Sequence, residues 1–264
     1  MENTIVSIGD LLRSWRQRRR LSQLELAVDA DISQRHLSFV ESGRSSPSRR
    51  MLLRLADELR IPVRERNRLL TVAGFAPEYC ERSLDEPDMA AARNAVELII
   101  SGHQPHPALV VDREWNLLLA NDAAHFLLEG IDPAFLTPPV NVLRLSLHPD
   151  GLAPRVANYR QWKAHVVDRL THQVDLTADP ALAKLLGEIE AYPAPDTARP
   201  YTEHDTSART GIAIPFELET PRGKLTFLST TTVFGTAVDI SLSEMVIETF
   251  FPMDAHTAEV MRSL

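Results

Sequence analysis

Apolar positions in the first 75 residues recur three and four apart, which is the spacing of amphipathic helices. Short polar segments, or segments with Pro or Gly, divide these positions into five runs, so the pattern predicts five helices. The predicted ranges are 7–19, 23–28, 34–41, 48–61 and 63–73. Five helices in so short a segment are enough for a complete all-α domain.

The second and third runs carry the caps and the turn of a helix-turn-helix. Ser22 begins a capping box at the start of the second helix, and Ser33 is the predicted cap of the third. We expect Leu24, Ala27 and Val28 to share one face of the second helix. Ala27 is small enough there to let a crossing helix approach closely. The alternative is an ordinary helical hairpin with a solvated basic face.

The third helix is expected to present long polar side chains from its first turns. Gln can bind adenine and Arg can bind guanine through two hydrogen bonds, each worth about 1 to 3 kcal/mol of discrimination. Gln34 and Arg35 are therefore the predicted base contacts, and Phe39 is placed to touch a thymine methyl group. The other predicted DNA-binding residues lie at helix starts, beside these two or in the basic loop and helix start that follow: Gln23, Ser33, Ser38, Ser42, Arg44 and Arg49.

These positions resemble the XRE-type family of helix-turn-helix regulators over about the first 60 residues. The matching residues are Gln23, Leu24, Ala27, Ser33, Leu37, Glu41, Gly43 and Pro47. The resemblance implies sequence-specific DNA binding and a lambda-repressor-like fold of five helices. It also implies a structural pair between Arg16 of the first helix and Glu41 at the end of the recognition helix.

Charge divides the chain into two dissimilar parts. Residues 1–70 carry 14 Arg against 9 acidic residues, a net of +5, whereas the whole chain has a net charge of −8. The basic part suits a polyanion, and the acidic remainder repels one. The single cysteine, Cys80, excludes an internal disulfide framework and fits a reducing cytoplasm. The N-terminus lacks a leader-like pattern and no segment is apolar enough to span a membrane, so we expect a cytoplasmic protein.

A Pro-rich acidic segment, 75–88, predicts the linker between two domains. We assign 1–75 to the helix-turn-helix domain, 76–104 to the linker and a connecting helix, and 105–264 to a second domain. The connecting helix is expected over 89–101, with Ala92, Ala95, Val96 and Ile99 on one face. The later pattern predicts strands at 108–111, 115–120, 211–218, 224–232 and 244–251, and helices after 121, near 140–147, over 157–173 and 180–191, and from 255. This order favours an α+β domain with an antiparallel sheet.

The second half resembles the ligand-binding domain of MmyB-like transcription regulators. The resemblance is carried by PPVNVLRLSLHPDGLAPR and by STTTVFGTAVDISLSEMVIETFFPMD, and the opening strands and Asn-led helix resemble a PAS-like sensor. It implies a domain that binds a small, fatty acid-like effector. His106 departs from the pattern, which favours Tyr there. A single recognition helix covers few base pairs, so we also expect a homodimer on a palindromic operator.

Two residues of the second domain are candidate effector contacts. Asn141, Arg144 and His148 have the spacing of one helical face, where Arg144 would bind an effector carboxylate. In the alternative interpretation this polar trio faces water. Trp162 is either part of the wall of an effector site or part of the core.

Two further hypotheses for the second domain stay open. It could serve only for dimerisation, or it could be an enzyme that uses His148, His165 and His172. No nucleophile elbow, phosphate loop or metal-ligand spacing orders these residues, and the HxxH of His103 and His106 lacks further ligands. We therefore expect no enzymatic activity, no cofactor and no metal. An apolar cavity would favour the sensor, a large apolar interface the dimerisation domain, and ordered titratable groups in a cleft the enzyme.

Overall fold

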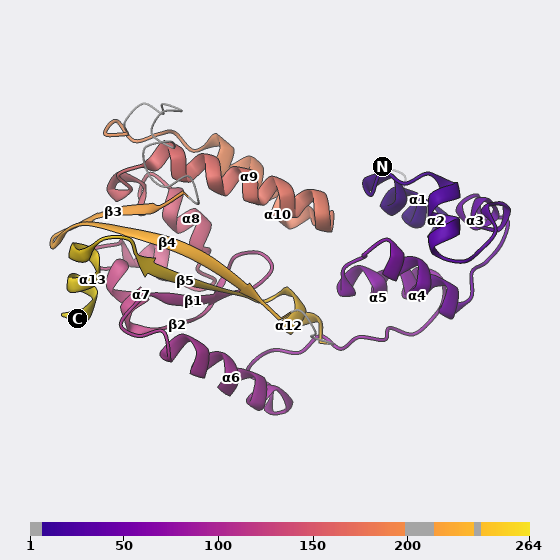
Figure 1. Ribbon diagram of the computed structural model, residues 1–264, viewed down its shortest axis with the longest axis horizontal. Coiled ribbons are helices and arrows are strands. Elements are labelled where there is room, and N and C mark those ends of the chain that lie inside the picture. The colour runs from indigo at the N-terminus through magenta and orange to yellow at the C-terminus, as the bar shows by residue number, and fades with distance from the viewer. Residues whose placement is uncertain (1–6, 199–213, 235–238) are drawn as a thin grey trace. The chain divides into compact units, whose positions relative to one another are not determined.

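The computed structural model describes residues 7–198, 214–234 and 239–264. The chain forms two compact units (Figure 1). One consists chiefly of residues up to Glu81 and the other chiefly of residues from Arg82 onward. No helix among the described residues has the length and apolar character required to cross a membrane.

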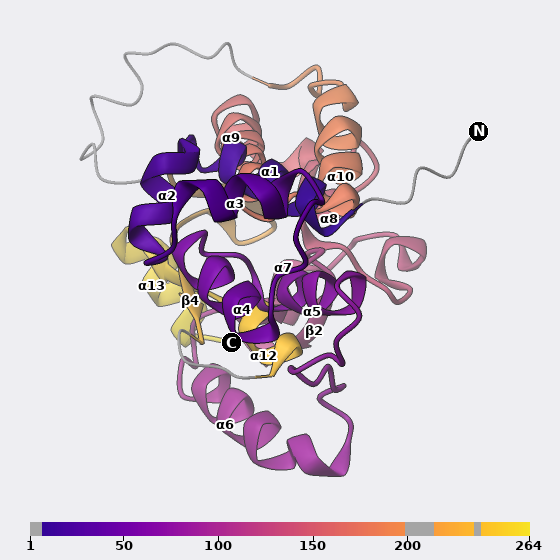
Figure 2. The same cartoon turned by 90° about the vertical axis from the view of Figure 1, so that its right-hand side faces the viewer.

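The N-terminal unit contains the five expected helices (Figure 2). They are α1 (Ile8–Arg18), α2 (Gln23–Asp29), α3 (Gln34–Glu41), α4 (Arg49–Glu58) and α5 (Val63–Val72). A serine precedes each of the first four, and its hydroxyl accepts a hydrogen bond from the backbone N–H three residues later. These bonds satisfy N–H groups that have no partner inside the helix, so the local sequence determines where each helix begins.

The buried face of α2 differs from the predicted one. Leu26, Ala27 and Ala30 are buried, whereas the side chains of Leu24 and Val28 are 56% and 68% exposed. The prediction was therefore right for Ala27 and wrong for its two companions. Apolar residues occupy most of the circumference of this short helix, so their spacing alone does not show which side meets the core.

Gly9 allows α1 to cross the end of α3 at close range. A Cβ atom at this position would lie 2.6 Å from the carbonyl oxygens of both Val40 and Glu41. Only glycine leaves room for that backbone approach. The glycine thereby fixes where α3 sits relative to α1.

The C-terminal unit combines a five-stranded antiparallel sheet with helices, as the sequence predicted. Its strands are β1 (Ala108–Val111), β2 (Leu117–Ala120), β3 (Phe216–Thr220), β4 (Gly223–Val233) and β5 (Val246–Pro252), in the order β2-β1-β5-β4-β3. Its helices are α6 (Ala90–Ser101), α7 (Asp122–Leu127), α8 (Val142–Leu147), α9 (Tyr159–Thr177), α10 (Pro180–Ala191) and α13 (Ala255–Arg262), and the short α12 (Ile240–Glu244) precedes β5.

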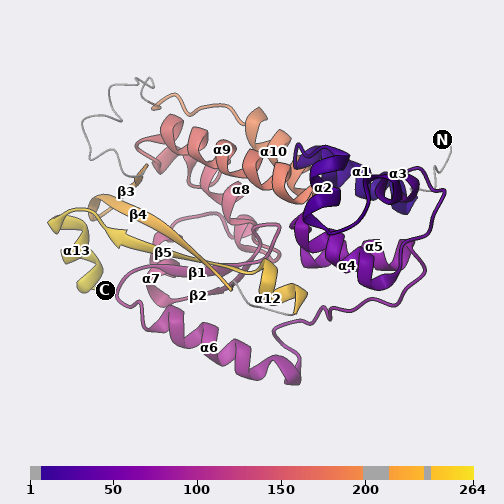
Figure 3. The ribbon, with the colours of Figure 1, turned by 45° about the vertical axis from the view of Figure 1, so that its right-hand side comes forward.

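Helices cover both faces of the sheet (Figure 3). α8, α9 and α10 lie on one side, where Trp115, Tyr159 and Phe227 belong to the main core. α6 lies on the other side, where Val96 and Ile100 pack in a second cluster with residues of β1 and β5. The sheet is thus the middle layer of the unit.

Local geometry alters three expectations for this unit. β2 begins at Leu117 and not at Trp115, because Trp115 has a φ of +68° and belongs to the preceding turn. β3 begins at Phe216, and the first residues of the predicted strand, 211–213, lie outside the described residues. On α6 the buried residues are Val96 and Ile100, whereas Ala95 and Ile99 are exposed, so the predicted face is right for Val96 and wrong for Ala95 and Ile99.

Candidate functional site

The first turns of α3 present the predicted base contacts to solvent. Gln34 and Arg35 are exposed and Ser38 is partly exposed. Within the described residues, none of these three side chains has a hydrogen-bond partner. Leu37 and Val40, on the opposite side of α3, are fully buried. The buried side fixes the helix in its domain and leaves free donors and acceptors on the exposed side.

Two arginines lie beside the aromatic ring of Phe39. The guanidinium carbon of Arg35 lies 5.3 Å from the ring centroid, and that of Arg44 lies 5.9 Å from it. These are cation–π distances, and such contacts reduce the freedom of long side chains. Arg35, Phe39 and Arg44 therefore form one surface with positive charge beside an apolar ring, which suits phosphate, guanine and a thymine methyl group.

A buried carboxylate holds the helix-turn-helix together from inside. Arg16 donates to both carboxylate oxygens of Glu41, from Nε to Oε1 at 2.7 Å and from Nη2 to Oε2 at 2.9 Å. Arg13 donates to the Glu41 backbone carbonyl at 2.7 Å. Burial raises the pKa of Glu41, but hydrogen bonds from Arg16 and Gln23 outweigh it and leave that pKa lowered. Glu41 therefore stays ionised and joins α1 to the end of α3.

Gln23 adds α2 to the same network. Its side-chain amide donates to Glu41 Oε2 at 2.8 Å. This bond orients the Gln23 side chain at the N-terminus of α2, where backbone N–H groups attract anions. The predicted phosphate contact Gln23 and the predicted structural pair thus meet at one carboxylate, a link that was not predicted from the sequence.

The other predicted contacts serve partly as structural elements of the fold. Ser33 caps α3 by accepting from the His36 N–H, and the Ser42 hydroxyl donates to the Phe39 carbonyl at 3.2 Å. After Ser42, the backbone N–H groups of Arg44 and of the next residue also bond the Phe39 carbonyl. Arg49 pairs with Glu78 at 2.7 Å, so a phosphate contact by Arg49 would require exchange of that partner.

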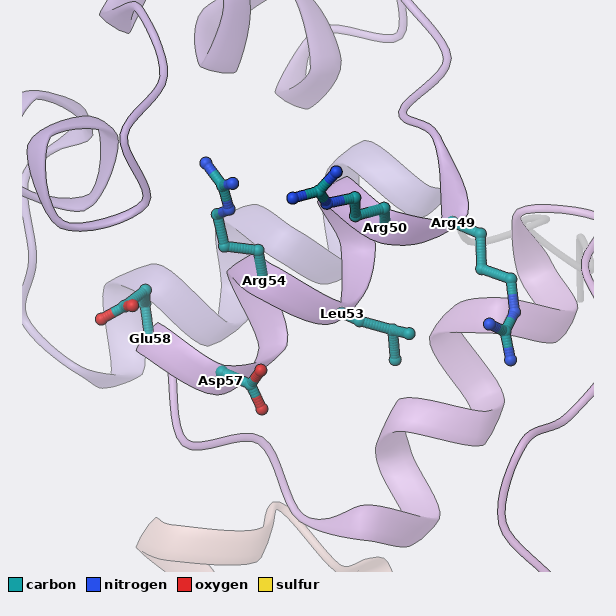
Figure 4. Close-up of a pocket in the computed structure, with 6 residues that line it drawn as sticks. All are labelled: Arg49, Arg50, Leu53, Arg54, Asp57 and Glu58. Carbon is teal, nitrogen blue, oxygen red and sulfur yellow. The ribbon is translucent and has the colours of Figure 1, made fainter.

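α4 also carries basic residues, but they share its surface with acidic ones. Six residues of α4 line an open hollow of about 580 Å³, namely Arg49, Arg50, Leu53, Arg54, Asp57 and Glu58 (Figure 4). Arg54 donates to the Ala30 carbonyl at 2.9 Å and so braces the end of α2. Asp57 pairs with Arg66. Three arginines at the start and middle of α4 are followed by two acidic residues at its end, so the hollow carries both signs of charge and α4 supports the helix-turn-helix more than it attracts an anion.

Arg144, the predicted effector contact, already has a carboxylate partner. Its Nε and a terminal nitrogen donate to the two oxygens of Glu188 at 2.8 and 2.9 Å, and the Tyr192 hydroxyl donates to the same carboxylate. Asn141 and His148 do not extend this face, because Asn141 is the buried N-cap of α8 and His148 its C-cap. An effector carboxylate would have to replace Glu188 to reach Arg144.

Trp162 on α9 combines burial with an unused donor. Its side chain belongs to the main core and is 5% exposed, and its indole Nε1 is buried without a hydrogen-bond partner in the described part of the chain. The Phe216 ring lies 4.8 Å away and the His165 ring 5.5 Å away, between centroids. Burial lowers the pKa of His165. A buried N–H without an acceptor is costly, so this position is suited to a bound acceptor group.

Comparison with known families now identifies both units. Residues 92–264 match the family model described as MmyB-like transcription regulator ligand binding domain. The chain belongs to this family. Residues 12–66 match a helix-turn-helix model. A search of the curated proteins found no match. This MmyB-like protein is therefore a DNA-binding transcription regulator with a ligand-binding domain, which confirms the two-part resemblance drawn from the sequence.

Both matching models describe parts of transcription regulators and not enzymes. Among the described residues of this MmyB-like regulator, no three His, Cys, Asp or Glu side chains gather as metal ligands would. His103 and His106 lie in the segment between α6 and β1, where the His103 ring contacts the Phe250 carbonyl at 3.1 Å. The His103 ring thus takes part in the packing of the unit.

Two residues that position the helices of the helix-turn-helix, Gly9 and Arg54, were not predicted from the sequence. A glycine inside a helical pattern is itself a signal of close packing, because it costs about 1 kcal/mol relative to alanine there. The sequence offers no comparable signal for Arg54, since a basic residue on an amphipathic helix is typical of a solvated face.

Proposed function

We propose that this regulator reads a specific DNA sequence with the exposed side of α3. Gln34 and Arg35 would bind base edges, Phe39 would contact a thymine methyl group, and Arg44 would bind phosphate. The observation that carries the proposal is the exposed pair of Gln34 and Arg35, which have no hydrogen-bond partner among the described residues, on a helix whose other side is fully buried. The further contacts proposed are Gln23, Ser33, Ser38, Ser42 and Arg49.

The proposed DNA-bound form is a cytoplasmic homodimer on a palindromic operator. Two half-sites about one helical turn apart would give each copy one major-groove contact. Separate binding by single domains would leave affinity and specificity low, because one module covers few base pairs.

We also propose that the C-terminal, PAS-like domain binds a small apolar or fatty acid-like effector. Two observations support it, namely the ligand-binding family of residues 92–264 and the unpartnered indole N–H of Trp162 among aromatic rings. Trp162 is a better candidate contact than Arg144, because Arg144 already has a bidentate partner. An effector changes DNA affinity if it binds one conformation of the protein better than another.

Selection from a randomised DNA library, followed by affinity measurements on the enriched site, tests the DNA-binding proposal. The expected result is one enriched, two-fold symmetric motif. Arg35→Ala should relax the preference at one base pair per half-site, a loss of about 1 to 3 kcal/mol of discrimination. Arg44→Ala should weaken binding to all sequences alike and lower the slope of log affinity against log salt by about 1.

The two variants are matched, because both arginines contact the same Phe39 ring. Equal loss of base preference in both variants would contradict the assignment of Arg35 to a base. Binding of the unaltered protein without sequence preference would contradict the proposal itself.

A further inference from the structure

α6 is apolar on two sides, and its own unit covers one of them. Val96 and Ile100 pack against the sheet, whereas Leu98 is 74% exposed and Ile99 is 43% exposed. A helix that is apolar on both sides is normally buried on both. The outer side of α6 therefore has the composition of an interface.

The outer side has a regular pattern, which we name the α6 stripe. The stripe consists of Ala91, Ala95, Leu98 and Gly102, all exposed. Successive members are four, three and four residues apart, the spacing of positions that face a partner helix in a coiled coil. The residues that flank the stripe are Ala92, Asn94, Ile99 and Ser101.

The stripe and its flanks carry no charged residue, although 24% of the chain is charged. The two charged residues within α6, Arg93 and Glu97, lie away from the stripe and pair with each other at 2.8 Å. A solvated helix face usually carries many such charges. The absence of charge along the α6 stripe favours contact with another apolar surface.

The order of side-chain sizes along the stripe is suited to a copy of itself. Ala95 and Leu98 lie equally far from the midpoint of the stripe, and so do Ala91 and Gly102. When two such helices run antiparallel about a two-fold axis, each Leu98 faces Ala95 of the other copy. Each Ala91 then faces a Gly102. Large residues meet small ones, and small residues meet small ones, so the helices can approach closely.

We propose that α6 pairs antiparallel with α6 of a second copy of this chain, across a two-fold axis through the α6 stripe. The inference rests on the homodimer of the proposed function and assigns the surface that forms it. A partner of another sequence would have no reason to match the two-fold arrangement of sizes. α6 directly follows the segment that leads from the helix-turn-helix, so this pairing joins the two DNA-binding units of a dimer.

Sedimentation equilibrium of the full chain without DNA tests the surface. The unaltered protein should have twice the chain mass of 29.6 kDa. Leu98→Glu should raise the dimer dissociation constant about a hundredfold, because dimerisation would then bury two carboxylates without partners. The matched control is Leu118→Glu on β2, where the side chain is 42% exposed and outside the stripe, and it should dimerise normally. A monomeric unaltered protein, or a Leu98→Glu variant that dimerises normally, would overturn the proposal.

Cysteine cross-linking tests the direction of the helices and does not depend on a disruptive variant. Cys80 is the one cysteine of the chain, so Cys80→Ser gives a cysteine-free background. Differently tagged chains with Ala95→Cys and with Leu98→Cys are mixed and oxidised. Antiparallel helices should give mainly the mixed disulfide, since these two positions face each other and a disulfide needs Cα atoms within about 7 Å. A majority of links between identical positions, or no link, would overturn the antiparallel pairing.

Both measurements are made without DNA, so their failure is distinguishable from failure of the proposed function. A dimer through α6 that selects no DNA sequence would leave this inference standing and would contradict the DNA-binding proposal. A monomer that still selects a DNA sequence would contradict the α6 pairing and leave the proposed base contacts of α3 standing.

Discussion

Glu41 is the residue through which three helices of the DNA-binding unit meet. Its side chain is fully buried and contacts Arg16 and Gln23. Removal of its charge would leave Arg16 without its carboxylate, and breaking a buried pair in this way costs about 3 kcal/mol. We therefore expect Glu41→Gln to lower the free energy of unfolding of the N-terminal unit by about that amount, measured by native-state hydrogen exchange of the α3 amides.

The effect of Glu41→Gln should depend on pH with a defined sign. The folded state lowers the pKa of Glu41 below its ordinary value of 4.5. The resulting stabilisation is complete above that value and is lost as the pH falls through the lowered pKa. The difference between unaltered protein and variant should therefore be constant near neutral pH and shrink in acid. Glu58→Gln, at an exposed position of α4, is the control, and a similar loss of stability there would contradict the predicted role of Glu41.

The types and spacing of the α3 residues were enough to place Gln34 and Arg35 on the exposed side. Base recognition and helix periodicity are both local properties, so a short segment contains them. The bond between Gln23 and Glu41 joins residues 18 apart in the chain. Such a contact depends on how two helices cross, which their separate patterns do not specify. The same limit applies to Arg144, whose partner Glu188 lies on another helix.

At the scale of the element, helix starts were predictable and helix faces less so. Ser22 and Ser33 begin α2 and α3 through bonds to their own helices, which sequence shows directly. The buried sides of α2 and α6 were misjudged, because both helices carry apolar residues on more than one side. Which side is buried depends on the element packed against it. Apolar periodicity cannot show this when two sides satisfy it.

The crossing of α1 and α3 gives a prediction for a single methyl group. Alanine in place of a helical glycine normally stabilises a protein by about 0.5 to 1 kcal/mol. Gly9→Ala should instead destabilise by about 1 to 3 kcal/mol, because the new Cβ would lie 2.6 Å from two backbone oxygens of α3. Chemical denaturation measures the change, and DNA affinity should fall for all sequences alike.

Gly187 in α10 is the matched control for this prediction. It is also a helical glycine, but a Cβ there would meet no atom within 4 Å. Gly187→Ala should therefore give the ordinary gain in stability and leave DNA affinity unchanged. A gain in both variants would show that α1 can move away from α3 without cost.

At the scale of the whole molecule, a basic helical unit and an acidic α+β unit share one chain. The charge difference concentrates DNA attraction in residues 1–70, which carry a net of +5 within a chain of net −8. A search for DNA-binding proteins by overall charge would pass over this chain. Its second unit belongs to a ligand-binding family, so regulation requires that occupation of one unit alter the behaviour of the other.

Native mass spectrometry of the purified full chain, with identification of any released molecule, tests the effector proposal. We expect a small apolar acid at fixed stoichiometry, and Trp162→Phe should weaken its retention about tenfold, because the substitution removes one buried hydrogen-bond donor of about 1.5 kcal/mol. Arg144→Lys is the informative control, since Arg144 already binds Glu188. It should leave retention nearly unchanged. Retention that fell with Arg144→Lys and not with Trp162→Phe would indicate that the acid group of the molecule binds at Arg144 on α8.

The released molecule then permits a thermodynamic test of regulation. If it changes the affinity of the protein for its selected DNA by some factor, that DNA must change the affinity for the molecule by the same factor. The factor reflects how much better the molecule binds one conformation or assembly than the other. If the Trp162 N–H contacts the molecule equally in both conformations, Trp162→Phe weakens binding to both by the same amount. The variant should then leave the factor unchanged. Equal ligand affinity with and without DNA would show that the C-terminal unit binds its ligand without regulating the N-terminal one.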